Sequence, residues 1–258
     1  GDIGRQNTVF KFYMQVWMLF SVMGGAVFAW VMAHVDQWSR VARALWYGVG
    51  GVLLFTAMLY PIMATPAKAV YRLADNMPLT FDGAKFMDYT TSYYEGDSIV
   101  DMQADANAIR WLQDNAQGTP AIMEAVSSGE YRWGARIAIQ SGFPAVIGWG
   151  FHQRQQRGLH DLTELVWQRA ANVNFFYRSG DIDAAWRILH FYNVEYVVVA
   201  GLERALYGLS GGLEKFPRMA ELGWLELAYS AENVEIYRVN RDANPAAFTA
   251  SVVTESRQ

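Results

Sequence analysis

The sequence lacks several residue patterns on which common functions depend. It contains no cysteine, which excludes a disulfide framework and metal sites built from thiolates. Its four histidines are dispersed, and no two of them stand at the spacing of a metal-binding pair. The net charge is -4 and no basic stripe with interleaved aromatic residues occurs, so a nucleic acid is not an expected partner. The sequence also has no internal repeat and no low-complexity segment.

Two long uncharged apolar runs stand out against these absences. They cover residues 12–33 and 44–67, and each is long enough for the ~20 helical residues that cross the hydrocarbon core of a bilayer. A signal peptide has a shorter apolar core and no second span close behind it, whereas a buried core helix stays open as an alternative. Aromatic residues that favour the headgroup zone lie mainly near the ends of the runs: Trp17, Trp30, Trp38, Trp46, Tyr47 and Tyr60. The sequence therefore predicts a two-helix transmembrane hairpin with its connection near residues 34–43.

Charged residues lie mostly after residue 67, which indicates a second, soluble part of the chain. We predict a membrane-surface segment and the two transmembrane helices in residues 1–73, a soluble domain in 74–240 and a polar tail in 241–258. The chain is expected to be an integral protein of the cell membrane. Its expected partners are membrane lipid and other transmembrane helices or subunits.

Helical and strand patterns alternate in the soluble part. Amphipathic patterns predict helices over residues 101–117, before a Gly-Thr-Pro stop at 118–120, and over 161–177 and 181–193. Apolar runs predict strands over 121–126, 144–149 and 194–201. Two strands joined by a short polar turn are predicted over 225–239, as a terminal hairpin. The alternation predicts an α/β domain with a mostly parallel sheet and helices on both faces.

Polar residues follow three of the predicted strands. In open α/β sheets ligands bind at the carboxyl ends of the strands, so these residues are binding candidates. They are Tyr131, Arg136, Trp149, His152, Gln153, Arg154, Arg157, Glu203, Arg204 and Tyr207. The arginines would suit a phosphate or a carboxylate through bidentate contacts. We expect Arg136, His152 and Glu203 to converge on one solvated rim, where Arg136 would matter more for an anionic ligand than for folding.

Each of these candidates also has a structural interpretation. Loops are polar because they are solvated, and Glu203 with Arg204 could be an ordinary surface ion pair. His152 could be a hydrogen-bonding loop residue, because no acid or nucleophile stands at a diagnostic spacing from it. Trp149 and Trp133 could stack on a sugar or simply pack in the domain. No catalytic residue, metal site or cofactor is evident from the sequence.

Ordered motifs over nearly the whole chain resemble a known family. GDIGRQNTVFKFYMQVW resembles the motif before a late transmembrane helix in the YYY family of prokaryotic polytopic membrane proteins, which is distantly similar to GT-C glycosyltransferases. The later segments YRWGARIAIQSGFPAVIGWGFHQRQQRG, NVNFFYRSGDIDAAWRILHFYNVEYVVVAGLERALY and LEKF resemble the carboxyl-terminal region of that family in the same order. One departure is Gln153, where we expect many relatives to carry a glutamate after the histidine.

The resemblance implies the carboxyl-terminal part of a longer membrane glycosyltransferase that uses a polyprenyl-phosphate sugar donor. Asp2, Arg5, Asn7 and Lys11 would then lie at the membrane surface, where the two basic side chains could meet a lipid phosphate or simply anchor the helix. The essential acidic residue, and any divalent metal, would belong to the longer parent protein, so the chain alone is expected to be inactive. The alternative is a non-catalytic structural or accessory subunit of a membrane complex.

The orientation in the membrane rests on two conflicting signals. Basic residues flank the soluble side of the predicted hairpin at Arg5, Lys11, Lys68 and Arg72, against Arg40 and Arg43 in the connection. By the positive-inside rule this count favours a cytoplasmic domain. The family resemblance implies an extracytoplasmic domain. We follow the family resemblance. The first helices of a polytopic protein usually set its orientation, and in the longer parent that the resemblance implies those helices would precede the two counted here.

Overall fold

The computed structural model describes residues 3–72, 76–90, 92–126, 129–157 and 162–243, and within these ranges the side chains from residue 8 onward except that of residue 72. It divides into two compact units, Gly1–Pro78 and Leu79–Gln258. The predicted domain limits near residues 73 and 240 stay predictions, because 73–75 and 244–258 lie outside the described residues. Asp2 also lies outside them, as do the side chains of Arg5 and Asn7.

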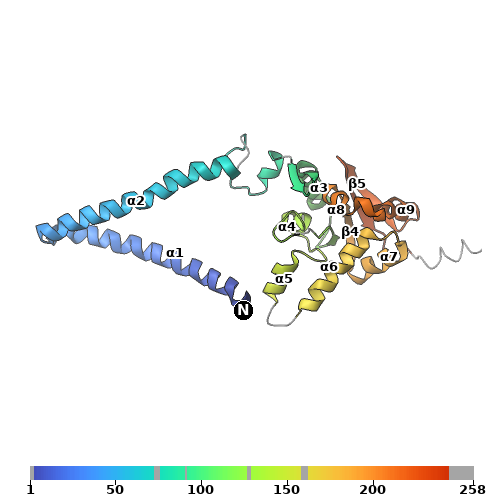
Figure 1. The fold of residues 1–258 in the computed structure, drawn as a ribbon, viewed down its shortest axis with the longest axis horizontal. Helices are drawn as coiled ribbons and strands as arrows, with labels where there is room; N and C mark the ends of the chain where they lie inside the picture. Colours follow the sequence, from blue (N-terminus) through green and yellow to red (C-terminus); the bar gives the residue numbers. More distant parts are fainter. Residues whose placement is uncertain (1–2, 73–75, 91, 127–128, 158–161, 244–258) are drawn as a thin grey trace, which may run out of the picture. The chain divides into compact units, whose positions relative to one another are not determined.

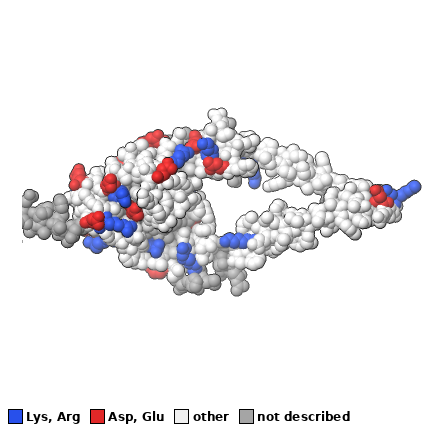
Figure 2. Space-filling view, turned by 180° about the vertical axis from the view of Figure 1, so that it is seen from behind, with Lys and Arg blue, Asp and Glu red and all other residues white. Residues whose placement is uncertain are grey.

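The first unit consists of two long helices, α1 (Ile3–His34) and α2 (Arg40–Arg72), joined by the short 3-10 helix η1 (Val35–Gln37). Both are long and apolar enough to cross a membrane, over Thr8–Gln37 and Arg40–Tyr71, and neither apolar stretch is buried in the described structure. This exposure argues against a core helix buried within the described chain. Figure 2 shows charged side chains at the turn between the helices and few along them.

The second unit is an α/β domain built on a four-stranded sheet (Figure 1). Its strands lie in the order β3 (Ala121–Met123), β4 (Val194–Val199), β6 (Val234–Val239) and β5 (Leu225–Ala231). β3 and β4 are parallel, whereas the other two pairs are antiparallel. The predicted mostly parallel sheet is therefore wrong, and the sheet is mixed.

The physical reason for the mixed sheet is the position of the terminal hairpin. β5 and β6 pair as predicted, across a turn in which Glu232 and Asn233 have φ angles of 52° and 65°. The hairpin then adds to the sheet through β6, antiparallel to β4. The strand predicted over 144–149 is reduced to a single bridge between Ala145 and Ile122. Too few parallel strands are left to make most of the sheet parallel.

Helices cover both faces of this sheet, as predicted (Figure 1). The helices of the second unit are α3 (Met102–Asn115), α4 (Arg136–Ser141), α5 (Gly150–Gln156), α6 (Thr163–Arg178), α7 (Ile182–Phe191), α8 (Gly201–Tyr207) and α9 (Lys215–Glu221). Tyr196 and Val198 of β4 pack on the α3 side, whereas Val197 and Val199 pack on the side of α6 to α9. Alternate residues of a strand point to opposite faces, so β4 is apolar from Tyr196 to Val199 because both of its faces are covered there, whereas Glu195 near its start is only partly buried.

Aspartate caps explain where two of the predicted helices begin. Asp101 accepts hydrogen bonds from the backbone N–H groups of Gln103 and Ala104 at the start of α3, and Asp181 accepts one from Ala184 at the start of α7. The sequence analysis did not predict the small antiparallel hairpin of β1 (Ser92–Glu95) and β2 (Ser98–Asp101), which leads directly into α3.

Candidate functional site

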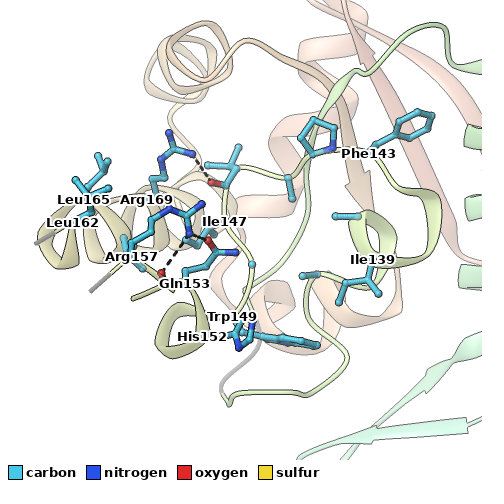
Figure 3. Close-up of a pocket in the computed structure, with 17 residues that line it drawn as sticks. Ile139, Phe143, Ile147, Trp149, His152, Gln153, Arg157, Leu162, Leu165 and Arg169 are labelled. Atoms are coloured by element: carbon cyan, nitrogen blue, oxygen red, sulfur yellow. Dashed lines mark hydrogen bonds between the residues drawn. The ribbon is translucent and has the colours of Figure 1, made fainter. Parts of the chain in front are cut away.

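A pocket of about 510 Å³ lies between α4, α5, α6 and the loop that connects α4 to α5 (Figure 3). Its size falls in the range that is typical of small-molecule sites, roughly 300–1,000 Å³. Seventeen residues line it: Ala135, Ala138, Ile139, Phe143, Pro144, Ala145, Val146, Ile147, Gly148, Trp149, His152, Gln153, Arg157, Leu162, Leu165, Val166 and Arg169.

The polar side of the pocket carries positive charge from Arg157 and Arg169. Among the described residues that line the pocket there is no aspartate or glutamate; residues 158–161 lie outside the described part of the chain. The Arg169 guanidinium donates a hydrogen bond of 3.1 Å to the Val146 carbonyl oxygen, which fixes its position against the loop. Arg157 donates to the side-chain oxygen of Gln153, one turn earlier in the chain (Figure 3). The Arg169 guanidinium also lies 5.4 Å from the centre of the Tyr192 ring. Guanidinium groups suit a phosphate or a carboxylate.

An aromatic corner adjoins the polar side. The rings of Tyr131 and Trp149 are 5.0 Å apart, and that of His152 lies 5.7 Å from Tyr131 and 6.3 Å from Trp149. The Tyr131 hydroxyl is 3.1 Å from His152 Nδ1, and the Glu130 carboxylate accepts hydrogen bonds from the backbone N–H groups of Phe151 and His152. These contacts hold the start of α5 and the imidazole in place beside the pocket.

Apolar side chains form the remaining walls. Ile139, Phe143, Leu162 and Leu165 contribute to them, and Ile139 and Leu165 are also exposed to solvent. The pocket therefore offers an apolar surface and a cationic surface to the same ligand. This combination favours an amphipathic anion over a small hydrophilic ion.

A second polar cluster lies in the interior of the domain, around Arg136. This guanidinium is 1% exposed and contacts three buried carboxylates. Arg136 Nε lies 2.6 Å from Asp105 Oδ2, Nη2 lies 2.9 Å from Glu203 Oε2, and Nη1 lies 3.8 Å from Glu124 Oε2. We name these four residues the Arg136 cluster.

The Arg136 cluster joins elements that are distant in the sequence. Glu203 accepts hydrogen bonds from the backbone N–H groups of Ala125 and Ala200, which follow β3 and β4. Glu124 accepts from Ile137 and Ala138 in α4, at 2.9 Å each. Since Ala138 also lines the pocket, the cluster positions one wall of the pocket.

Burial and the charges of the Arg136 cluster shift the pKa values of its three carboxylates in different directions. Burial by itself raises the pKa of Glu203, but Arg136 and hydrogen bonds outweigh burial and hold it below its usual value. Burial raises the pKa of Asp105, although Arg136 opposes the shift. Burial raises the pKa of Glu124 to about 7, again against Arg136. The Glu124 carboxylate lies further from the Arg136 guanidinium than the other two carboxylates do. The positive charge therefore offsets less of the effect of burial on the pKa of Glu124.

The raised pKa of Glu124 predicts how stability depends on pH. The folded protein binds this proton more tightly than the unfolded chain, so the stabilisation is fully present below the ordinary value of 4.5 and is lost as the pH rises to about 7. We expect the free energy of unfolding to fall more steeply over this window in the wild type than in Glu124→Gln. Urea unfolding at a series of pH values measures the difference. Parallel profiles for the two proteins would contradict the assignment.

The structure separates the residues that were expected to share one solvated rim. Arg136 and Glu203 do meet, but both are buried, so the prediction that Arg136 is a solvated residue is wrong. The sequence analysis placed this ion pair on the surface, but Asp105, Glu124 and the backbone N–H groups of Ala125 and Ala200 supply its polar partners in the interior. His152 belongs instead to the pocket, together with Trp149, Gln153 and Arg157.

The other candidates have contacts outside the pocket lining. The Arg154 guanidinium lies over the Trp167 ring at 4.6 Å, and Arg204 pairs with Glu235 at 3.0 Å rather than with its neighbour Glu203. Tyr207 stacks on Tyr177 at 5.1 Å and is buried. Trp133 donates a hydrogen bond to Asp105, which supports its structural interpretation. Of the membrane-surface candidates, the structure describes the side chain of Lys11, which is exposed on α1.

Three residues of these sites were missed by the sequence analysis: Asp105, Glu124 and Arg169. Glu124 carried a usable signal, because it is the one charged residue in the apolar strand segment AIMEAV and a buried charge needs a partner. Asp105 resembles an ordinary acidic residue in the first turns of a helix, and Arg169 resembles a solvated helix residue. In the described part of the chain, no group of three or more histidine, aspartate or glutamate side chains could hold a metal ion.

No family model matches the chain, and no curated protein sequence matches it. Among solved structures, the domain is similar to the C-terminal globular domain of an oligosaccharyltransferase from Archaeoglobus fulgidus, with 12% sequence identity and a TM-score of 0.33. The alignment covers 52% of this chain and 96% of that domain. A similarity of this size carries no argument about function, and the YYY family stays a hypothesis from the sequence motifs.

Proposed function

We propose that this chain is part of a membrane glycosyltransferase of the GT-C type, and that its α/β domain binds the polyprenyl-phosphate end of a sugar donor in the pocket. The observation that carries the proposal is the presence of two arginines and an apolar wall in one pocket, whose described lining residues include no carboxylate. The two helices of membrane-crossing length support it, because a lipid-linked donor must be reached from a bilayer. The order of the sequence motifs supports the same class of protein.

Each side of the pocket has a role in this proposal. Arg157 and Arg169 bind the phosphate oxygens, where charge-assisted hydrogen bonds are strongest. The first isoprenyl units pack on the wall that Ile139 and Leu165 form. Trp149 offers a ring face to the sugar, with the imidazole of His152 beside it. The soluble domain is proposed to be extracytoplasmic, as the family resemblance implies.

Binding of a short isoprenyl phosphate tests the proposal. We expect farnesyl phosphate to bind the full chain in nanodiscs of neutral lipid, and to bind more tightly than farnesol or inorganic phosphate, because only the phosphorylated lipid engages both surfaces. Isothermal titration calorimetry measures the three affinities. Equal affinity for farnesyl phosphate and farnesol, or no binding of either, would exclude the proposed role of the arginines.

The chain by itself is expected to catalyse no sugar transfer. Glycosyl transfer needs an activated acceptor and stabilisation of the charge that develops on the leaving phosphate. Among the described lining residues of the pocket none is a carboxylate, and Gln153 cannot act as a general base. The sequence contains one Asp-x-Asp motif, at Asp181 and Asp183, but Asp181 caps α7. Turnover of polyprenyl-phosphate sugars by the purified chain measures this, and any transfer above the protein-free rate would contradict it.

The alternative function is a non-catalytic structural or accessory subunit of a membrane complex. The Arg136 cluster favours it, because these carboxylates are committed to holding the fold rather than presented to a ligand. Activity that appears only when further helices and an acidic loop are supplied by other chains or segments would support the enzyme. Inactivity of the isolated chain and of the complex in which it occurs would favour the accessory subunit.

A further inference from the structure

A short loop at the start of the second unit presents two fully exposed apolar side chains. Leu79 is 102% exposed and Phe81 is 111% exposed, relative to the reference state of each residue. They belong to residues 79–83, with which the second unit begins and which we name the apolar loop. Exposure of one large apolar side chain is common, whereas two at full exposure two residues apart indicate a surface with a partner.

The base of the apolar loop is ordered by polar contacts. The Asp82 backbone N–H donates to Thr80 Oγ1 at 3.0 Å, and the Asp82 carboxylate accepts from the Ala84 backbone N–H at 2.9 Å. The 3-10 helix η2 (Lys85–Asp88) follows. Asp88 in it pairs with Lys85 and with Arg110 of α3, and Met87 is buried in the core. Leu79 and Phe81 therefore project from a segment that is anchored to the domain.

The position of the loop in the sequence indicates what it meets. The last two turns of α2 carry Lys68 and Tyr71, and tyrosine and basic residues are typical of the membrane–water interface. Only six residues lie between Arg72 and Leu79, and the chain from one Cα atom to the other reaches at most about 25 Å when extended. The polar headgroup layer is about 5–8 Å thick on each side of the hydrocarbon core. Leu79 and Phe81 are thus within reach of the layer at which α2 ends.

We propose that the apolar loop inserts Leu79 and Phe81 into the interface of the bilayer that α2 crosses, and so tethers the α/β domain to the lipid surface. The proposal rests on the membrane-crossing assignment of α2 and does not depend on the ligand of the pocket. A bilayer is the occupant that fits, because the two side chains are continuous with a membrane-crossing helix. The uncharged stretch from Met77 to Phe81 has no side chain that an interface of this kind would exclude.

The absence of cysteine makes a spin-label experiment straightforward, since any introduced cysteine is the sole labelling site. Leu79→Cys and Phe81→Cys variants of the full chain are labelled and placed in nanodiscs. Leu54→Cys, near the middle of α2, is the lipid reference. Leu209→Cys is the matched control, because Leu209 is 107% exposed and lies in the same unit far from α2 in the sequence. Collision rates with oxygen and with a water-soluble nickel chelate measure the depth of each label.

The expected result is that labels at positions 79 and 81 collide several-fold more often with oxygen than with the nickel chelate, compared with the label at position 209. Labels at 79 and 81 that collide with the nickel chelate as often as the label at 209 would overturn the proposal, whether they are mobile or immobilised. A water-accessible label at position 54 would overturn it as well, because α2 would then not cross the bilayer. Farnesyl phosphate binding is measured independently, so a failure here leaves the proposed function to its own test.

Discussion

Replacing Arg136 with methionine is expected to lower the free energy of unfolding by about 3–5 kcal/mol. The substitution leaves Asp105 and Glu203 buried without their cationic partner, and a buried unpaired charge is strongly unfavourable. Methionine keeps most of the volume of the side chain, so the loss reports the charge rather than a cavity. Chemical unfolding of the full chain in detergent, followed by circular dichroism, measures the change.

Two further variants make this result decisive. Arg187→Met removes an exposed arginine on α7 and is expected to change stability by no more than about 0.5 kcal/mol. Arg136→Lys keeps the positive charge but cannot bind two carboxylates through a planar fork, so an intermediate loss is expected. If Arg136→Met unfolds like Arg187→Met, the Arg136 cluster does not stabilise the fold. If Arg136→Met cannot be purified, the intermediate loss in Arg136→Lys still tests the assignment.

Replacing Arg157 and Arg169 together with alanine is expected to weaken farnesyl phosphate binding about 10- to 100-fold. Each guanidinium is proposed to donate charge-assisted hydrogen bonds to the phosphate, and these are worth more than neutral ones. Binding of farnesol should change little, because the apolar wall is intact. Calorimetry on the full chain in nanodiscs measures both affinities.

The single variants separate direct from indirect effects. The Arg157 side chain contacts Gln153, which is close to it in the sequence. Arg157→Ala should therefore lower the affinity for farnesyl phosphate without altering the unfolding transition of the protein. Arg169 also supports the loop through the Val146 carbonyl oxygen, so Arg169→Ala is expected to affect both measurements. Arg187→Ala is the control for loss of a positive charge elsewhere. Equal weakening by Arg157→Ala and Arg187→Ala would show a general charge effect and contradict the proposed site.

Prediction from the sequence succeeded where a local pattern is sufficient. The helices α3 and α7 begin at aspartate caps that the sequence shows directly, and β4 is an apolar run because both of its faces are buried. The prediction of a mostly parallel sheet was wrong. The sequence of β6 is compatible with parallel or antiparallel pairing, and the packing of the terminal hairpin makes it antiparallel to β4. The strand at 144–149 failed because its apolar residues line a pocket instead of pairing in the sheet.

The site shows the same limit. Arg136 and Glu203 both follow predicted strands, and strand order correctly brings them together. Whether a residue at the end of a strand faces solvent or the interior depends on the elements that cover it. Asp105 of α3 and Glu124 of the β3 segment supply the charges that allow Arg136 to be buried. Neither residue is near Arg136 in the sequence, and so no local pattern pairs them.

The sequence by itself determined the two helices of membrane-crossing length, the α/β class of the domain and most of its helices and strands, because hydrophobic periodicity and caps act over a few residues. The tertiary structure alone decided the mixed sheet, the burial of Arg136 and the pocket that gathers Arg157 and Arg169 beside an apolar wall. These features arise from contacts between residues far apart in the chain. Such contacts depend on how whole elements pack, and packing is a property of the folded domain rather than of any segment.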